Sequence, residues 1–220
     1  MKRDVLIVLQ HADQFLAGLL NTLWLSGATL ALASILGCAV AALMLSPQRI
    51  VRLPASLLVD AMRAVPFLLL AYLVYYGLPL AGVRFGSWSS GLAALVIYHT
   101  AYVAEIVRGA WSNLSHDQIE AGKAYGFGGF RLFRRIILPQ LFYASAPVIG
   151  NQAVQIVKDT AFLMIITVPE LTFTASSVQA TYFVPFASFI AAMLLYWLVT
   201  LTIEAAVRMV EAAADMRRAA

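Results

Sequence analysis

The sequence has 220 residues, of which 62% are hydrophobic and only 12% are charged. Its mean hydropathy is +0.83. A soluble domain of this length cannot bury so much apolar surface, so the composition excludes an ordinary soluble protein and predicts a chain that lies mostly in lipid.

The charged residues divide the chain into long apolar segments. Five intervals of 20 residues or more contain no Asp, Glu, Lys or Arg. A helix needs about 20 mostly apolar residues to cross the hydrocarbon core of a bilayer. We therefore expect an all-α integral membrane protein with five transmembrane helices, near residues 16–45, 57–78, 92–109, 140–157 and 186–207.

Residues 1–14 precede the first expected span. Lys2 and Arg3 are followed by a short apolar piece, Val5–Leu9, without the cleavage site of a signal peptide. We expect a short amphipathic helix that lies on the membrane surface. The domain organisation expected is an interfacial segment over 1–14, a transmembrane domain over 15–210 and a cytoplasmic tail over 211–220.

The basic residues predict the orientation of the chain. If the five spans alternate in direction, ten Lys and Arg residues fall on one side, and only Lys2, Arg3 and Arg84 fall on the other. The positive-inside rule makes the side with ten basic residues cytoplasmic. The N-terminus is then outside and the C-terminus is cytoplasmic.

The stretch 111–139, between the third and fourth spans, is the least hydrophobic part of the chain. Ser115 is expected to cap a short helix. Gly126 is expected to end that helix, because glycine readily adopts a positive φ. A second short helix is expected over 129–137, and Pro139 then opens the fourth span in its first turn.

The segment before the last span is too short to cross a membrane and too apolar for an ordinary loop. An apolar piece, Ala161–Val168, is closed by Pro169 and Glu170. We expect a re-entrant or short helix near the outer face, because irregular backbone at membrane depth is tolerated where it lines a cavity.

Charged residues inside the spans need either a partner or a function, because each costs about 2.5–3.5 kcal/mol at the centre of a membrane helix. Asp60 and Arg63 are three residues apart, as are Glu105 and Arg108. Each pair could neutralise itself on one helix face. The alternative, which the sequence leaves open, is that these charges bind a solute.

A stripe of polar residues runs along the fourth span. Asn151, Gln155 and Asp159 recur every four residues and therefore share a helix face, whereas Lys158 points elsewhere and Thr160 follows. Such a stripe is typical of a pocket or pore wall. Hydrogen bonding between helices is the alternative.

Two groups of motifs carry a family resemblance. The spacing of Glu120-Ala121-Gly122, Gly126 and Ile136-x-Leu138-Pro139 resembles the EAA loop of ABC importer permeases. Gly122 is a departure, since the family usually has alanine there. Further motifs resemble the polar amino-acid uptake branch, the histidine, glutamine and arginine type of permease: Met62–Pro66, Tyr75–Gly77, Ala101–Ala110, Leu138–Gln140 and Lys158–Thr160.

This second resemblance extends over essentially residues 21–207 and has two departures near the expected path. The family commonly has Arg-Gly-Thr-Pro where this chain has Arg63-Ala64-Val65-Pro66. The family often has Thr-Ser-Leu where this chain has Thr160-Ala161-Phe162-Leu163. Both departures bear on which solute is carried.

The resemblance implies a permease subunit that forms a translocation path for a polar amino acid or a related small solute. The loop 116–139 would be a cytoplasmic coupling helix that docks onto a separate ATPase, with its small residues approaching a groove on that partner. The residues expected to couple to the ATPase are Glu120, Ala121, Gly122, Gly126, Leu138 and Pro139. The residues expected along the path are Arg63, Glu105, Asn151, Gln155, Lys158, Asp159 and Thr160.

Roles follow for four charged residues, three on the expected path and one at the outer gate. Arg63 could grip a carboxylate through two hydrogen bonds. Asp159 or Glu105 could accept from an ammonium group. Glu170 would lie at the outer gate, where it would help to close the path or meet the protein that delivers the solute.

The resemblance also implies partners and a location. We expect a second permease subunit, identical or paralogous, two ABC ATPase subunits, an external solute-binding protein and the bacterial inner membrane, but no nucleic acid. The chain has no phosphate-loop motif, so ATP and Mg would be bound by the ATPase partner. No catalytic set or metal cluster indicates an enzyme. The alternatives are a secondary transporter or channel subunit, or a non-transporting membrane scaffold.

Overall fold

The computed structural model describes residues 2–219, with the side chains of 2–210 and 212. Every regular element in the described part is helical. In chain order the elements are α1 (Lys2–Gln10), α2 (Ala12–Met44), α3 (Arg49–Ala64), α4 (Phe67–Tyr72), η1 (Leu73–Gly77), η2 (Leu78–Ala81), α5 (Ser87–Ser112), α6 (His116–Ala124), α7 (Gly129–Leu132), η3 (Phe133–Ile137), α8 (Leu138–Thr160), η4 (Ala161–Ile166), α9 (Leu171–Tyr182) and α10 (Pro185–Ala219).

Three helices are long and apolar enough to cross a membrane: α2, α5 and the part of α10 up to Val210. The number rises to five if each of two bent helix pairs forms one span. One pair joins α3 to residues 67–81, and the other joins residues 129–166 to α9. The all-helical membrane fold is therefore confirmed, and five spans remain the upper count.

The expected second span, near 57–78, is not one continuous helix. The axis turns by 104° between α3 and the helices that follow it. Val65 is extended, with φ −88° and ψ 135°, and Pro66 caps the next helix. A residue before proline avoids the helical region, because the proline ring clashes with it. The break is thus encoded locally.

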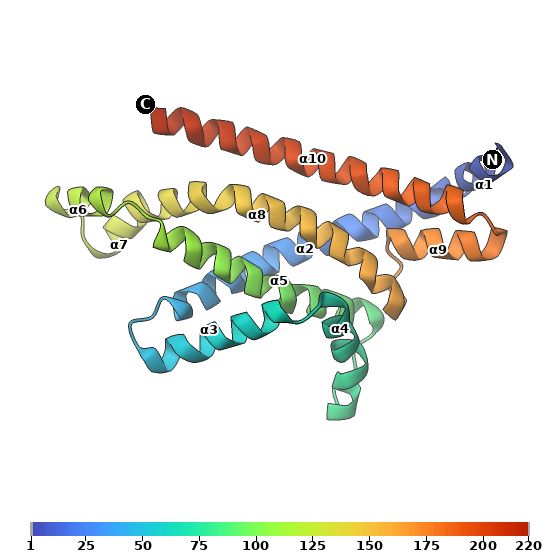
Figure 1. Cartoon of the computed structure of the whole chain (residues 1–220), viewed down its shortest axis with the longest axis horizontal. Helices are drawn as coiled ribbons and strands as arrows, with labels where there is room; N and C mark the ends of the chain where they lie inside the picture. Colours follow the sequence, from blue (N-terminus) through green and yellow to red (C-terminus); the bar gives the residue numbers. More distant parts are fainter. Residues whose placement is uncertain (1, 220) are drawn as a thin grey trace.

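The helices run side by side, and their connections gather at two ends (Figure 1). α2 lies against α5, α5 against α8, and α8 against α10. α6, α7 and the C-terminal end of α10 lie at one end of the molecule, while α1, α9 and the N-terminus lie at the other. The two termini are therefore at opposite ends.

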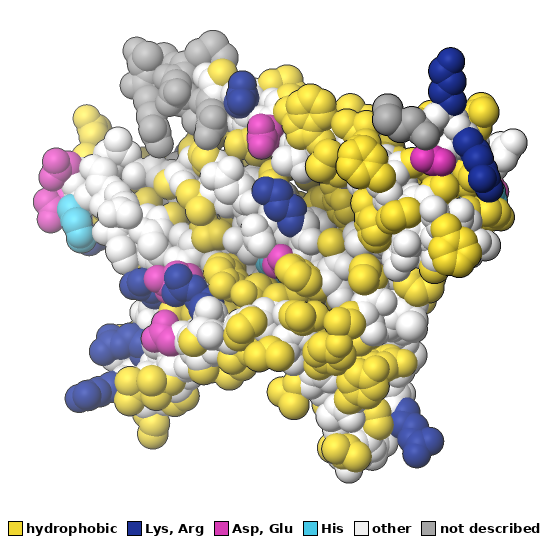
Figure 2. Space-filling model, turned by 45° about the vertical axis from the view of Figure 1, so that its right-hand side comes forward, with side chains coloured by type: hydrophobic (Ala, Val, Ile, Leu, Met, Phe, Trp, Pro, Cys, Tyr) yellow, Lys and Arg dark blue, Asp and Glu magenta, His cyan; other side chains and the backbone are white. Residues whose placement is uncertain are grey.

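Small residues allow α2 and α5 to approach closely. Gly37 of α2 faces Val103 and Ala104 of α5, and a Cβ atom at Gly37 would lie only 2.6 Å from Val103 Cγ1. Membrane helices associate through such contacts, because lipid supplies no hydrophobic force that drives them together. Large apolar side chains face outward instead, and Figure 2 shows hydrophobic side chains over much of one face, with several Lys and Arg side chains at its margins.

The two terminal segments are both helical. α1 exposes Val5, Leu6 and Leu9, each more than half exposed, while Ile7 and Val8 pack against a core cluster to which α2, α9 and α10 contribute. This division suits a helix at a membrane surface. α10 continues without a break to Ala219. The domain boundaries expected at residues 14 and 210 therefore remain predictions.

A candidate transport path and a candidate coupling loop

The loop between α5 and α8 begins with the expected helix. The Ser115 hydroxyl oxygen accepts the backbone N–H of Gln118 over 3.4 Å and so caps the N-terminus of α6. The helix ends at Ala124. Gly126 follows with φ +82°, which a residue with a side chain rarely adopts. The cap, the helix and the glycine are confirmed as local structure.

Gly122 has a role within the chain that the sequence did not indicate. It is buried, and a Cβ atom there would lie 2.9 Å from Leu132 Cδ1 and would also overlap Ile136. The close approach that glycine permits is therefore to η3 and α7 of the same chain. Ile136 belongs to the Ile-x-Leu-Pro end of the loop motif, so this contact joins the two ends of the motif.

The exposed face of the loop carries side chains of several kinds. Glu120 and Ala121 are exposed on α6, and Leu138 and Pro139 are exposed where α8 begins. Tyr125 and Phe130, which were not among the residues expected to couple to the ATPase, are 85% and 75% exposed. Two large exposed aromatic side chains in a polar loop are a signal from which a contact surface could have been predicted.

A buried polar cluster joins α5 to α8. His99 of α5 is fully buried, and its Nδ1 lies 2.7 Å from the amide nitrogen of Gln152. Its Nε2 lies 3.4 Å from a carboxylate oxygen of Asp159. Gln155 donates to the other oxygen of Asp159 over 2.9 Å. The stripe expected on α8 thus meets a histidine that the sequence did not single out.

A second polar group lies nearby on α3 and α5. Glu105 accepts two hydrogen bonds from Arg108, of 2.8 and 2.5 Å. Arg63 forms its ion pair with Glu105 at 3.8 Å and lies over the ring of Tyr102. The expected pairing of Glu105 with Arg108 is confirmed, whereas the ion pair of Arg63 is with Glu105 and not with Asp60.

A pocket of about 370 Å³ opens between these two groups. Its lining comes from α5 and α8: Tyr98, Tyr102, Val148, Asn151, Gln152 and Gln155. Asn151 and Gln155 therefore stand where a pocket wall was expected. Asp159 is only 3% exposed and lies behind the wall.

The other expected path residues lie apart from this pocket. Lys158 lines a different pocket of about 330 Å³, together with Thr172 and Tyr196. Thr160 is buried, and its hydroxyl donates to the carbonyl of Val157. Lys158 and Asp159 thus face different surroundings, as their adjacent positions on a helix predict.

Glu170 is fully buried at the start of α9. Its carboxylate accepts the backbone N–H groups of Thr172 at 2.8 Å and Phe173 at 2.6 Å, and the hydroxyl of Tyr196 at 2.7 Å. It therefore caps α9 and ties it to α10. The expected role at an outer gate stays a prediction.

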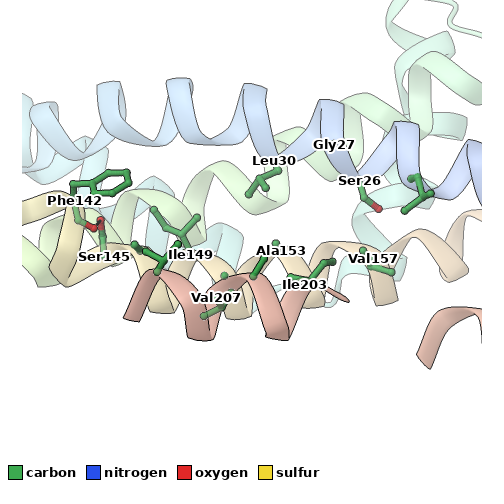
Figure 3. Close-up of a pocket in the computed structure, with 15 residues that line it drawn as sticks. Ser26, Gly27, Leu30, Phe142, Ser145, Ile149, Ala153, Val157, Ile203 and Val207 are labelled. Atoms are coloured by element: carbon green, nitrogen blue, oxygen red, sulfur yellow. Dashed lines mark hydrogen bonds between the residues drawn. The ribbon is translucent and has the colours of Figure 1, made fainter. Parts of the chain in front are cut away.

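A groove larger than the polar pocket is apolar and lies on the other side of α8. It has a volume of about 500 Å³ between α2, α8 and α10, and its labelled lining includes Ile149, Ala153 and Val207 (Figure 3). At 100° per residue, Ile149 and Ala153 lie on the face of α8 opposite Asn151 and Gln155. A polar solute finds few partners in this groove, so the smaller polar pocket is the better candidate path.

Two tyrosines that were not among the expected path residues, Tyr98 and Tyr102, share one face of α5 with Glu105, which was. Tyr98, Tyr102 and Glu105 follow one another at spacings of four and three residues, which places them on the same side of a helix. A search for polar periodicity in the third span would have found them. His99 has no such signal, because only the packing of α5 against α8 brings it to Gln152.

An all-helical membrane fold, a pocket with a polar lining between two of its helices and a structured loop at one end are typical of a membrane transport component. Residues 17–215 match the family model of the binding-protein-dependent transport system inner membrane component. The chain belongs to this family.

The relatives agree with this assignment. The chain is 30% identical to the probable glutamine ABC transporter permease protein GlnM of Bacillus subtilis strain 168, over 94% of this chain and 96% of GlnM. It is 32% identical to the nopaline transport system permease protein NocM of Agrobacterium fabrum strain C58, over 94% of this chain and 90% of NocM.

Solved structures share the fold. An amino acid ABC transporter crystallised with histidines has a chain that is 27% identical, with a TM-score of 0.88 over 94% of this chain and 97% of that one. An inward-facing methionine transporter, MetNI, has a TM-score of 0.69 over 91% of this chain and 98% of its own. Its identity is 17%, so it supports the fold alone.

Proposed function

We propose that this chain is the permease subunit of an ABC importer that carries a polar amino acid or a related small solute across the inner membrane. The observation that carries the proposal is the polar pocket between α5 and α8, in a chain whose family consists of transport components. Support for the solute class comes from relatives named for glutamine and nopaline transport.

The pocket and its rim offer groups for both ends of an amino acid. The Arg63 side chain is 37% exposed and has one ion-pair partner, Glu105. Its remaining N–H donors are suited to a carboxylate. Glu105 and the amides of Asn151 and Gln155 could accept from an ammonium group, with the Asp159 carboxylate behind them. Lys158 and Thr160 would act farther along the path, and Glu170 would help to close it.

The loop over 116–139 is proposed to dock onto a separate ATPase, which binds ATP and Mg. Its exposed surface includes Glu120, Tyr125 and Phe130. The buried contact of Gly122 against Leu132 and Ile136 would let the loop move as one body. Two ATPase subunits, a second permease subunit and an external solute-binding protein would complete the assembly.

The orientation proposed is an N-terminus outside and a C-terminus in the cytoplasm. The opposite ends of the termini in Figure 1 support this arrangement, as do the basic residues of the α6–α7 end. Cysteines introduced at positions 2 and 123, in a chain whose single Cys38 is replaced by serine, test it. If position 123 is labelled from outside intact cells, the orientation is the opposite of the one proposed.

Reconstitution tests the function. The permease is copurified with its ATPase, placed in liposomes and supplied with its binding protein, and uptake of labelled L-glutamine and L-arginine is measured. We expect uptake that requires ATP hydrolysis. Uptake driven by an ion gradient without the ATPase would indicate a secondary transporter, and a chain that copurifies with no ATPase would indicate a scaffold.

A further inference from the structure

The hydrogen-bond partners of the pocket amides decide which chemical groups face a solute. The amide nitrogen of Gln152 is directed to Nδ1 of His99, and that of Gln155 donates to Asp159. Neither glutamine has a side-chain carbonyl oxygen with a partner among the described residues. Both residues line the pocket. Each therefore has its amide nitrogen committed inward and its carbonyl oxygen free to accept.

The tautomer of His99 follows from the same contacts. Because Nδ1 accepts from the Gln152 amide, the ring proton of the neutral imidazole is on Nε2. Nε2 faces the Asp159 carboxylate, 3.4 Å away. This nitrogen makes no hydrogen bond in the described structure. His99 therefore holds Gln152 directly, whereas Asp159, which lies beside the ring, holds Gln155.

The tyrosine hydroxyls of the pocket also have oxygen lone pairs that are free to accept a hydrogen bond. The Tyr102 hydroxyl donates to the carbonyl of Arg63, and its oxygen lies 3.1 Å from the Tyr98 hydroxyl. Tyr98 must then be the donor in that pair, because the proton of Tyr102 is already used. The lone pairs of Tyr98 remain free. Among the polar lining residues, only Asn151 has no bond that fixes the direction of its amide in the described structure.

From these contacts we infer that His99 and Asp159 are positioning residues, which fix Gln152 and Gln155 respectively with their carbonyl oxygens toward the pocket and so select solutes with a cationic side chain. This inference rests on the proposed function and adds the substrate class. A lining of acceptors, with a buried carboxylate behind it, suits an alkylammonium or guanidinium group. The α-carboxylate of the same solute would lie near Arg63.

Two solutes of equal shape and different charge provide the test. L-citrulline has a neutral ureido group where L-arginine has a guanidinium. Binding of each is measured to the complex of permease and ATPase in nanodiscs. We expect the wild-type complex to bind L-arginine at least tenfold more tightly than L-citrulline.

The variants separate positioning from packing. His99→Phe keeps a ring beside Phe67 and Tyr98 but removes the acceptor of the Gln152 amide, so the preference for L-arginine over L-citrulline should fall severalfold. His99→Gln restores an acceptor and a donor and should recover part of it. Thr100→Val is the matched control, because the Thr100 hydroxyl is buried on the same helix without a hydrogen-bond partner in the described structure.

A second change acts on the amide of Gln155, which Asp159 holds. Asp159→Asn keeps the side-chain volume and can both accept and donate, so the amide of Gln155 is free to reverse. The arginine preference should fall in this variant as well. Basal ATP hydrolysis by each complex shows whether the variant has assembled.

The outcomes distinguish this inference from the proposed function. A His99→Phe complex that assembles and keeps the full arginine preference overturns the positioning role. A wild-type complex that imports L-citrulline as well as L-arginine overturns the cationic selectivity but leaves an amino-acid permease. A wild-type complex that carries no amino acid in the presence of ATP overturns both.

Discussion

The carboxylate of Glu170 should be one of the main points at which α9 and α10 are held together. It is fully buried and accepts three hydrogen bonds, from Thr172, Phe173 and Tyr196. Glu170→Ala removes the cap of α9, which costs about 1 kcal/mol. It also leaves the half-buried Tyr196 hydroxyl without its charged acceptor, which costs about 1–3 kcal/mol. The expected loss of stability is therefore about 2–4 kcal/mol.

This loss can be measured as a melting temperature. For a protein of this size, 1 kcal/mol corresponds to about 2–4 °C, so Glu170→Ala should lower the melting temperature by about 4–16 °C. Fluorescence of the four tryptophans reports unfolding of the purified protein. Glu170→Gln keeps one carbonyl acceptor and should cost about 1 kcal/mol. Glu120→Ala, at an exposed site, should leave the melting temperature unchanged.

A double-mutant cycle isolates the bond between the two helices. Tyr196→Phe removes the donor and should cost about 1–2 kcal/mol. If Glu170 and Tyr196 act through this bond, the double variant should lose about 1–2 kcal/mol less than the sum of the single losses. Strict additivity, or a Glu170→Ala protein that melts within about 2 °C of wild type, would refute the assignment of Glu170 as the link between α9 and α10.

Three further predictions concern the loop and the path. The Gly126→Asp protein should insert normally but uncouple uptake from ATP hydrolysis, because a side chain at φ +82° strains the backbone by about 1 kcal/mol. Gly128→Asp, at an equally open site with φ −136°, is the control and should have a milder effect. Equal uptake by the two variants would contradict the role of the turn. Gly122→Val should overlap Ile136 and lower stability by about 1–3 kcal/mol, read as a lower melting temperature. Arg63→Lys should raise the KM of uptake while changing stability by less than about 1 kcal/mol, because the ion pair is partly exposed; an unchanged KM would remove Arg63 from the path.

Several features of this protein could be read from the sequence because they depend on neighbouring residues. The charge-free intervals establish a helical membrane chain, since the cost of a buried charge acts on each segment separately. Ser115 and Gly126 set the ends of α6 through a cap and a positive φ. The spacing of Asn151 and Gln155 placed them on one face of α8, where the pocket lies. The bend at Pro66 also depends on neighbouring residues, because a residue before proline avoids the helical region.

The remaining features required the tertiary structure, because periodicity determines which residues share a face but not which faces meet. His99 and Gln152 are 53 residues apart, and only the packing of α5 on α8 joins them. The ion pair of Arg63 with Glu105 depends on how α3 lies against α5. The same holds for Gly122, whose small size is used against Ile136 of its own chain, and for Glu170, which is buried against α10. Each of these pairings is a property of how the helices pack together, and no single segment of the sequence specifies it.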